Sequence, residues 1–147
     1  MSPFDWRTVL FAKHAQHVVL IHFPIALFVV AVAFDVLALW LNKSAWSEFA
    51  YFNLTLASLF AIPTVLTGLA AWQWQLEGQR LKGILLYHLL TASAAASCIW
   101  ASWWIRFRQR RAPSPARTDL ALVVELLGAA LVVVAGHLGG FLSGVNS

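Results

Sequence analysis

The chain has 147 residues, of which 61% are hydrophobic and only 11% are charged, and its mean hydropathy is +0.74. These proportions exclude an ordinary soluble domain and indicate a single integral membrane domain over 1–147. Ten Lys and Arg residues outnumber six Asp and Glu residues, which gives a formal charge of +4. These charges lie mostly in short connectors, where they bear on membrane topology, so the expected partner is the lipid bilayer and not nucleic acid.

In chain order, the first expected element is a short interfacial segment at 3–14, with apolar side chains suited to the headgroup layer. Four apolar stretches follow, each long enough to cross about 30 Å of hydrocarbon as a helix. They cover 18–41, 50–74, 83–106 and 119–142. Because the connectors are short, neighbouring spans must run antiparallel. The predicted fold is therefore an all-α, up-and-down four-helix bundle in the membrane.

The third connector, at 105–118, predicts the direction of the bundle. It contains the sequence RFRQRRAPSPAR, and a short loop this basic is expected to stay in the cytoplasm. Both termini and the 75–82 loop would then lie on the outer, periplasmic face of a bacterial inner membrane. The charges do not all agree, because only Lys43 joins these arginines on the inner side, and the outer side carries Arg7, Lys13, Arg80 and Lys82.

Histidines gather at the outer ends of three predicted spans. At the helical rise per residue, His22, His88 and His137 lie at matched depths of about 6 to 9 Å, and His17 lies just above them. An imidazole inside a membrane is costly unless it faces protein and finds a partner. This pattern predicts a functional site near the outer face, although hydrogen bonds between helices remain an alternative.

A b-type haem is the cofactor that fits such a layer best, since it needs two axial imidazoles across a bundle core. His22 and His88 are the preferred axial pair because spans one and three lie on a diagonal, and His88 with His137 is the second choice. His17 would serve a propionate or act as a supporting donor, and Arg80 and Lys82 could also meet propionates. Small residues in spans three and four would give the macrocycle room or, equally, allow close helix packing; they include Gly128, Ala129, Ala130, Ala135 and Gly136.

Two other functions stay open at this point. The same histidines, with His137 as an alternative ligand, could bind copper, zinc or non-haem iron. A cofactor-free accessory subunit of a membrane complex would use them as hydrogen-bonding groups between helices. No hydrolytic or phosphate-binding motif occurs in the chain, so an electron-transfer protein or subunit is expected more than a stand-alone enzyme.

Two acids and two prolines lie inside the spans. Asp35 and Glu125 fall near the inner ends of neighbouring helices, where they could form a pair or a proton entrance. The competing interpretation is that each forms an ion pair with Lys43, Arg106 or Arg108. Pro24 is expected to break the first span just after His22, and Pro63 to free a carbonyl in the second.

Several motifs together resemble a known family. They are HVVLIHFPIAL at 17–27, FD at 34–35, TGLAAW at 67–72, YH at 87–88 and GHLGG at 136–140. They resemble the bacterial four-span membrane family catalogued as domain of unknown function 2231 (DUF2231). One departure is Val18, where members more often have proline.

The resemblance implies a b-haem electron-transfer module that works with a separate periplasmic partner, such as a c-type cytochrome or a Rieske protein. By resemblance, the family's histidines fall on His17, His22 and His88, and its glycine pair on Gly139 and Gly140. Quinone binding and homo-oligomerisation stay open.

Overall fold

A computed structural model describes residues 15–112 and 119–143, and all regular structure in these ranges is helical. The elements are α2 (Ala15–Leu20), α3 (His22–Trp40), α4 (Ser44–Gln75), α5 (Gly83–Arg111) and α6 (Asp119–Leu142). Four stretches are long and apolar enough to cross a membrane: Gln16–Trp40, Ser44–Trp74, Gly83–Arg111 and Leu120–Leu142. The prediction of four helical spans is confirmed. The predicted interfacial segment at 3–14 lies outside the described residues.

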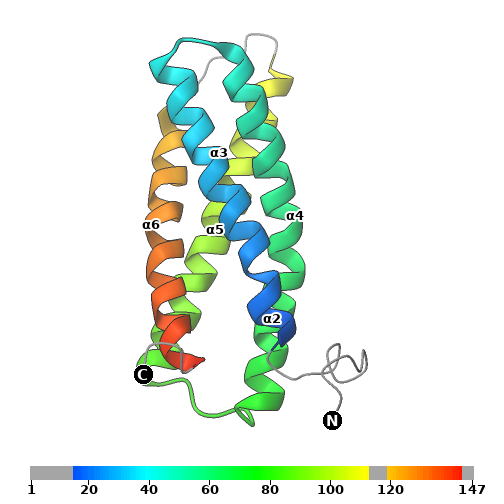
Figure 1. The fold of residues 1–147 in the computed structure, drawn as a ribbon, viewed down its shortest axis with the longest axis vertical. Coiled ribbons are helices and arrows are strands. Elements are labelled where there is room, and N and C mark those ends of the chain that lie inside the picture. Colours follow the sequence, from blue (N-terminus) through cyan, green and yellow to red (C-terminus); the bar gives the residue numbers. More distant parts are fainter. Residues whose placement is uncertain (1–14, 113–118, 144–147) are drawn as a thin grey trace.

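The four long helices alternate in direction and close into a bundle (Figure 1). α3 packs against α4 and α6, and α5 packs against α4 and α6, so α3 and α5 lie on a diagonal. The up-and-down order expected from the short connectors is therefore present. We call the end with α2, the α4–α5 connection and the last turns of α6 the histidine end; it carries His17, His22, His88 and His137. The opposite end is the arginine end; it carries Asp35, Arg106 and Glu125.

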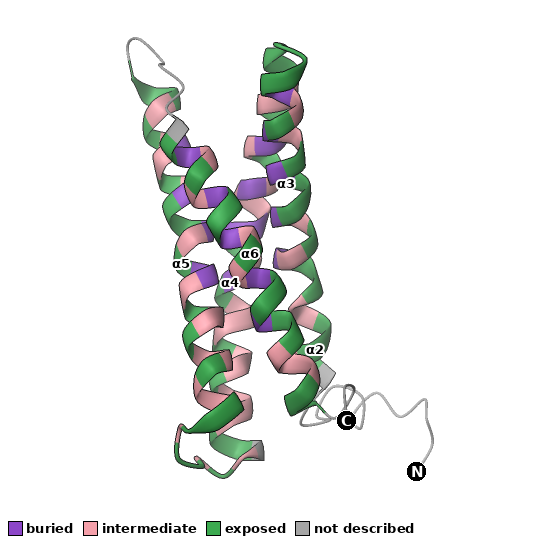
Figure 2. Cartoon of the chain, turned by 90° about the vertical axis from the view of Figure 1, so that its left-hand side faces the viewer, coloured by how far each residue is buried: buried purple, intermediate pink, exposed green. Residues whose placement is uncertain are grey.

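Packing differs along the bundle. Fully buried side chains line the interior from the middle to the arginine end (Figure 2). The core centres on Phe28 and Leu54, with small residues around them. Gly128 is required here, because a Cβ at this position would lie 2.8 Å from Cys98 Cβ and 2.9 Å from Phe28 Cζ. Among the described side chains at 16–23, 62–94 and 136–143, none is fully buried.

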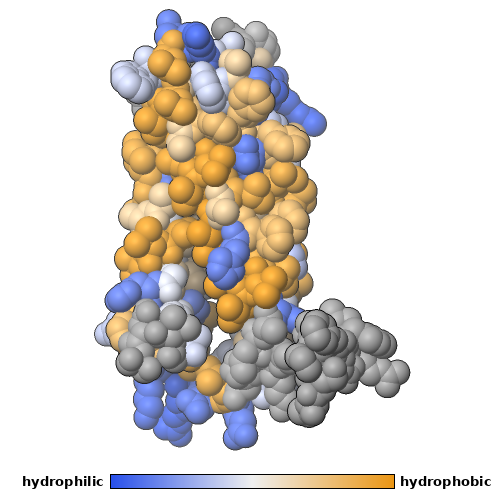
Figure 3. Space-filling view, in the orientation of Figure 1, coloured by the Kyte–Doolittle hydropathy of each residue, from blue (hydrophilic) through white to orange (hydrophobic). Residues whose placement is uncertain are grey.

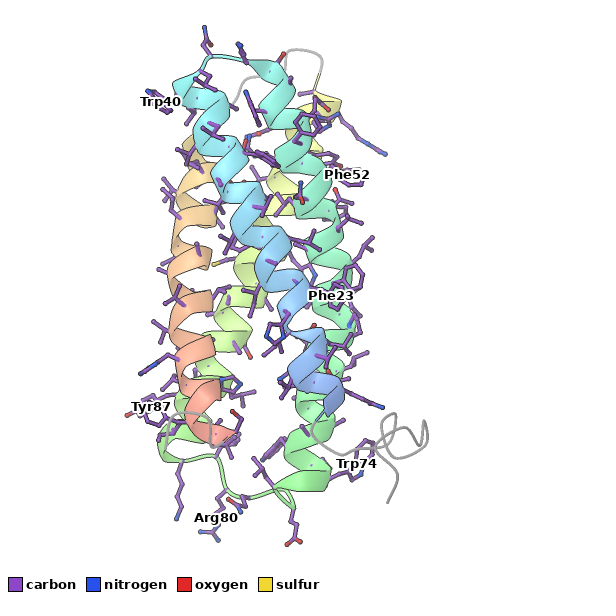
Figure 4. The ribbon with its side chains drawn as sticks, in the orientation of Figure 1. Phe23, Trp40, Phe52, Trp74, Arg80 and Tyr87 are labelled. Atoms are coloured by element: carbon purple, nitrogen blue, oxygen red, sulfur yellow. The ribbon has the colours of Figure 1, made fainter. Side chains whose placement is uncertain are left out.

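The outer surface of the bundle is apolar and fits contact with lipid (Figure 3). Large exposed side chains include Phe52 and Val133. Trp40 is 80% exposed at the arginine end and Trp74 is 73% exposed at the histidine end (Figure 4). Such tryptophans are typical anchors at the two membrane interfaces.

Two helices are longer than the predicted spans. α4 begins at Ser44 instead of 50, and α5 continues to Arg111 instead of ending at 106. The arginines of the third connector explain the second difference, because Arg106 is buried inside the bundle and Arg110 binds Glu48 of α4 at 2.7 Å. Much of the sequence that looks like a basic loop is therefore the last turns of a helix.

Candidate functional site

The site at the histidine end starts from a break in the first span. Pro24 has no N–H, so the carbonyl of Leu20 cannot accept the usual helical hydrogen bond. α2 ends at Leu20 and α3 begins at His22. The hydroxyl of Thr64 on α4 lies 3.3 Å from the Leu20 oxygen and 2.9 Å from the Phe60 oxygen, so the two carbonyls share its proton. The helix is thus interrupted at Ile21, between His17 and His22, and Pro24 itself lies in the first turn of α3.

His17 points from α2 into α4. Its Nδ1 lies 3.2 Å from Oγ1 of Thr67, and the ring is partly buried. Gly68 makes the approach possible, because a Cβ there would lie 2.9 Å from His17 Cε1. Thr67 and Gly68 of the TGLAAW motif therefore hold this imidazole, one by a hydrogen bond and the other by leaving space. We call such a position the seat of the imidazole.

His88 has a matching seat between α5 and α6. Its Nδ1 lies 3.0 Å from the carbonyl oxygen of Ala135, and a Cβ at Gly139 would lie 3.1 Å from His88 Cε1. Gly139 of the GHLGG motif thus leaves space for the imidazole. The carbonyl comes from Ala135, the residue just before the motif. His17 and His88 therefore both lie at the histidine end, each held by a hydrogen bond to another helix.

His22 and His137 lie differently. His22 is exposed, and its Nδ1 is bonded to the carbonyl oxygen of Val18 in the preceding turn at 2.7 Å. His137 is exposed and packs edge-on against Phe141, with ring centroids 5.1 Å apart. The predicted layer is therefore at one end of the bundle, but its four rings do not all face the interior.

The hydrogen bonds assign the tautomers of three imidazoles. Carbonyl oxygens only accept, so Nδ1 of His22 and of His88 must donate. The Thr67 hydroxyl directs its own proton to the carbonyl of Pro63 at 2.8 Å, so it accepts from His17 Nδ1. Each neutral ring then keeps its lone pair on Nε2. This arrangement is typical of histidines that bind a metal through Nε2 while the other nitrogen is held in place.

The donor set fits two-ligand coordination. Within residues 15–112 and 119–143, no group of three or more His, Cys, Asp and Glu side chains is arranged to hold a metal ion. Two inward imidazoles from different helices are what an iron with two axial histidines requires. His17 on α2 and His88 on α5 come from different helices, and each has its Nδ1 held by a neighbouring helix.

Two cations lie close by on the α4–α5 connection. A cavity of about 400 Å³ is lined by Gln79, Arg80, Lys82 and Leu85. Arg80 projects from the histidine end of the molecule (Figure 4). The small residues expected to flank a cofactor divide into two kinds, because Gly128 is closely packed and a Cβ at Gly136 would meet nothing within 4 Å.

A second polar cluster occupies the arginine end. Arg106 Nη2 lies 2.5 Å from Asp35 Oδ2, and Arg106 Nε lies 3.3 Å from Glu125 Oε1. All three residues are buried, with relative exposures of 6%, 1% and 0% in the order Arg106, Asp35, Glu125. Sequence reasoning listed Arg106 as one of several partners for the acids and also as part of a cytoplasmic loop. What it missed is that one guanidinium joins both acids inside the bundle.

Comparison with known proteins gives a family and nothing further. The family model described as "Predicted membrane protein (DUF2231)" matches residues 13–145. No curated protein and no solved structure matches the chain. The matched range includes all four membrane helices and both polar clusters.

Proposed function

This chain belongs to the DUF2231 family of predicted membrane proteins, and from that premise and the seats of His17 and His88 we propose that it is a b-type cytochrome-like electron-transfer protein. The observation that carries the proposal is the pair of inward imidazoles on α2 and α5. Each has its Nδ1 engaged by a neighbouring helix and its Nε2 lone pair available. A haem bound between them would supply one-electron transfer.

The geometry favours His17 over His22 as the partner of His88. His22 is exposed and its hydrogen bond stays within its own turn, whereas His17 and His88 are partly buried and each is hydrogen-bonded to another helix. His22 and His88, the pair expected from sequence, remain the alternative. Thr67 and Ala135 orient the two preferred rings, and Gly68 and Gly139 leave space beside them.

The packing of the histidine end also supports a cofactor there. Its described side chains are at most partly buried, while the arginine half is closely packed. A macrocycle needs apolar walls and space, which closely packed protein interiors do not offer. Arg80 and Lys82 at the same end provide positive charge for propionate groups.

The proposal includes sidedness and partners. The histidine end would face the periplasm and the arginine end the cytoplasm, because Arg108 and Arg111 are exposed at the arginine end and short basic segments stay inside. Electrons would then pass between the bound haem and a separate periplasmic redox protein, such as a c-type cytochrome or a Rieske protein.

A reduced-minus-oxidised visible spectrum of the purified protein in mild detergent, with a pyridine haemochrome assay, tests the proposal. We expect a low-spin b-type spectrum with haem near one per chain. Haem should be lost in His17→Ala and His88→Ala and retained in the exposed controls His22→Ala and His137→Ala.

Three other results would change the conclusion. Loss of haem in His22→Ala with retention in His17→Ala would restore the pair expected from sequence. A folded protein with copper, zinc or non-haem iron and no porphyrin would indicate a metal site instead. A folded protein with neither, after expression with ample haem, would indicate an accessory subunit without a cofactor.

A further inference from the structure

The arginine-end cluster is unbalanced in charge. Arg106 contributes one positive charge, and the carboxyl groups of Asp35 and Glu125 would contribute two negative charges if both were ionised. Both acids are at most 1% exposed. An uncompensated charge in a membrane interior is costly, and a buried carboxylate without its own counter-ion takes up a proton instead. Charge balance in this cluster therefore requires one proton.

The hydrogen bonds show where that proton fits. Asp35 has the closer contact with the guanidinium, at 2.5 Å against 3.3 Å for Glu125. Glu125 Oε2 is buried and has no hydrogen-bond partner. A buried oxygen without a partner costs more on a charged carboxylate than on a neutral carboxylic acid, so Glu125 is the acid on which the proton fits better.

An independent observation comes from α5. Ser102 is 0% exposed, and its Oγ also has no hydrogen-bond partner. It lies one helical turn before Arg106 on the same buried face of the helix. A buried hydroxyl without a partner is rare in a folded protein. The Ser102 hydroxyl is therefore a second polar group without a partner on the face of α5 that carries Arg106.

The charged surroundings leave the balance unchanged. α4 brings Glu48 and Tyr51 to this end of the bundle, and both contact Arg110, one turn beyond Arg106 on α5. Arg110 and Glu48 form a neutral pair with exposed side chains.

We propose that the Asp35–Arg106–Glu125 cluster is a binding site for one exchangeable proton. A carboxylate of the pair takes the proton from water at the arginine end and becomes a carboxylic acid; release returns the carboxylate and the proton to the same water. This site is independent of the haem proposal, because it lies at the opposite end of the bundle and uses different side chains.

Infrared spectroscopy of the full-length protein in lipid nanodiscs tests the site. We expect the wild type to show the carbonyl stretch of a protonated carboxylic acid at neutral pH, shifted when H₂O is replaced by D₂O. Glu125→Gln should abolish the band. Asp35→Asn should abolish it as well, because one acid and one guanidinium are neutral without a proton. Glu48→Gln, in the exposed pair, should leave the band unchanged.

The following results would overturn the proposal or one of its parts. Absence of the band in the wild type, or its persistence in either buried variant, would overturn the one-proton count. A band that does not shift in D₂O would mean a trapped structural proton and would overturn exchange. If Asp35→Asn fails to fold, Arg106→Gln gives the same test, because loss of the cation should roughly double the band intensity, and an unchanged intensity would overturn the proposal.

Discussion

The two ends of the bundle solve the same problem, polar groups inside a membrane, in different ways. At the arginine end, charged side chains from α3, α5 and α6 form an ion cluster in a closely packed interior. At the histidine end, imidazoles bind single hydroxyl or carbonyl groups, and the packing is looser. The comparison teaches that one end holds its polar groups by ion pairs in a closely packed core, and the other by single hydrogen bonds between helices.

The largest effect that would test this comparison is expected at Arg106. Arg106→Gln leaves two buried acids without a cation, and breaking a buried ion cluster in this way typically costs about 3–5 kcal/mol. Reversible unfolding in detergent measures the change in the free energy of unfolding. The exposed Arg108→Gln is the control and should change it by less than about 0.5 kcal/mol. Equal effects of the two substitutions would mean that the cluster does not hold the arginine end together.

The next effect is expected at Gly68. In Gly68→Ala, the new Cβ would lie 2.9 Å from His17 Cε1, so the His17 side chain must move away from Thr67. Overpacking of this kind costs about 1–3 kcal/mol, and the seat of the imidazole should be lost with it.

Thermal unfolding and the haem content of the purified protein measure both consequences. Gly136→Ala is the matched control, because a Cβ there would meet nothing within 4 Å. It should be neutral or slightly stabilising, since alanine favours helix over glycine by up to about 1 kcal/mol. If both variants behave alike, the contact of Gly68 with His17 has no role.

A smaller effect is expected at the α2–α3 break. Thr64→Val keeps the shape of the side chain but removes the hydroxyl proton that the Leu20 and Phe60 carbonyls share, at a cost of about 0.5–1.5 kcal/mol. Amide hydrogen exchange across residues 16–25 should accelerate. Thr91→Val is the control, because that hydroxyl donates only within its own helix, to Tyr87 and His88. Unchanged exchange in Thr64→Val would show that the break is stable without α4.

The smallest effect is expected for the exposed ion pair. Glu48→Gln removes the partner of Arg110, but exposed pairs contribute only about 0–1 kcal/mol and are screened by salt. The difference from wild type should shrink as ionic strength rises. A large, salt-independent loss of stability would mean that this exposed pair stabilises the fold as much as the buried cluster does.

Hydropathy and connector length were enough to predict the four spans, their order and the gathering of histidines at one end. They could not predict which way each side chain faces. In a soluble helix the polar face marks the outside, but here lipid and core are both apolar, so the pattern holds no such signal. His17 and His22 illustrate this: their spacing predicts different directions, yet only packing against α4 decides that His17 faces inward and His22 outward.

Arg106 shows a second limit. In the sequence it is the first of several arginines in what looks like a loop, and the positive-inside rule treats them alike. The long-range contacts with Asp35 and Glu125 distinguish it, and such contacts are fixed by tertiary structure. Gly68 and Gly139 show the same limit. Each leaves space for an imidazole from another helix, and the sequence does not indicate which helix packs there.

The buried arginine also constrains how the protein is made. One partner of Arg106 precedes it by 71 residues and the other follows it by 19. Because synthesis runs from the N-terminus, the third span enters the membrane with Asp35 already in place and Glu125 still to come. The ion pair of Arg106 and Asp35 has no net charge, so this intermediate can remain in the bilayer. The last helix then delivers Glu125, the second acid of the cluster, which on the one-proton proposal enters together with a proton.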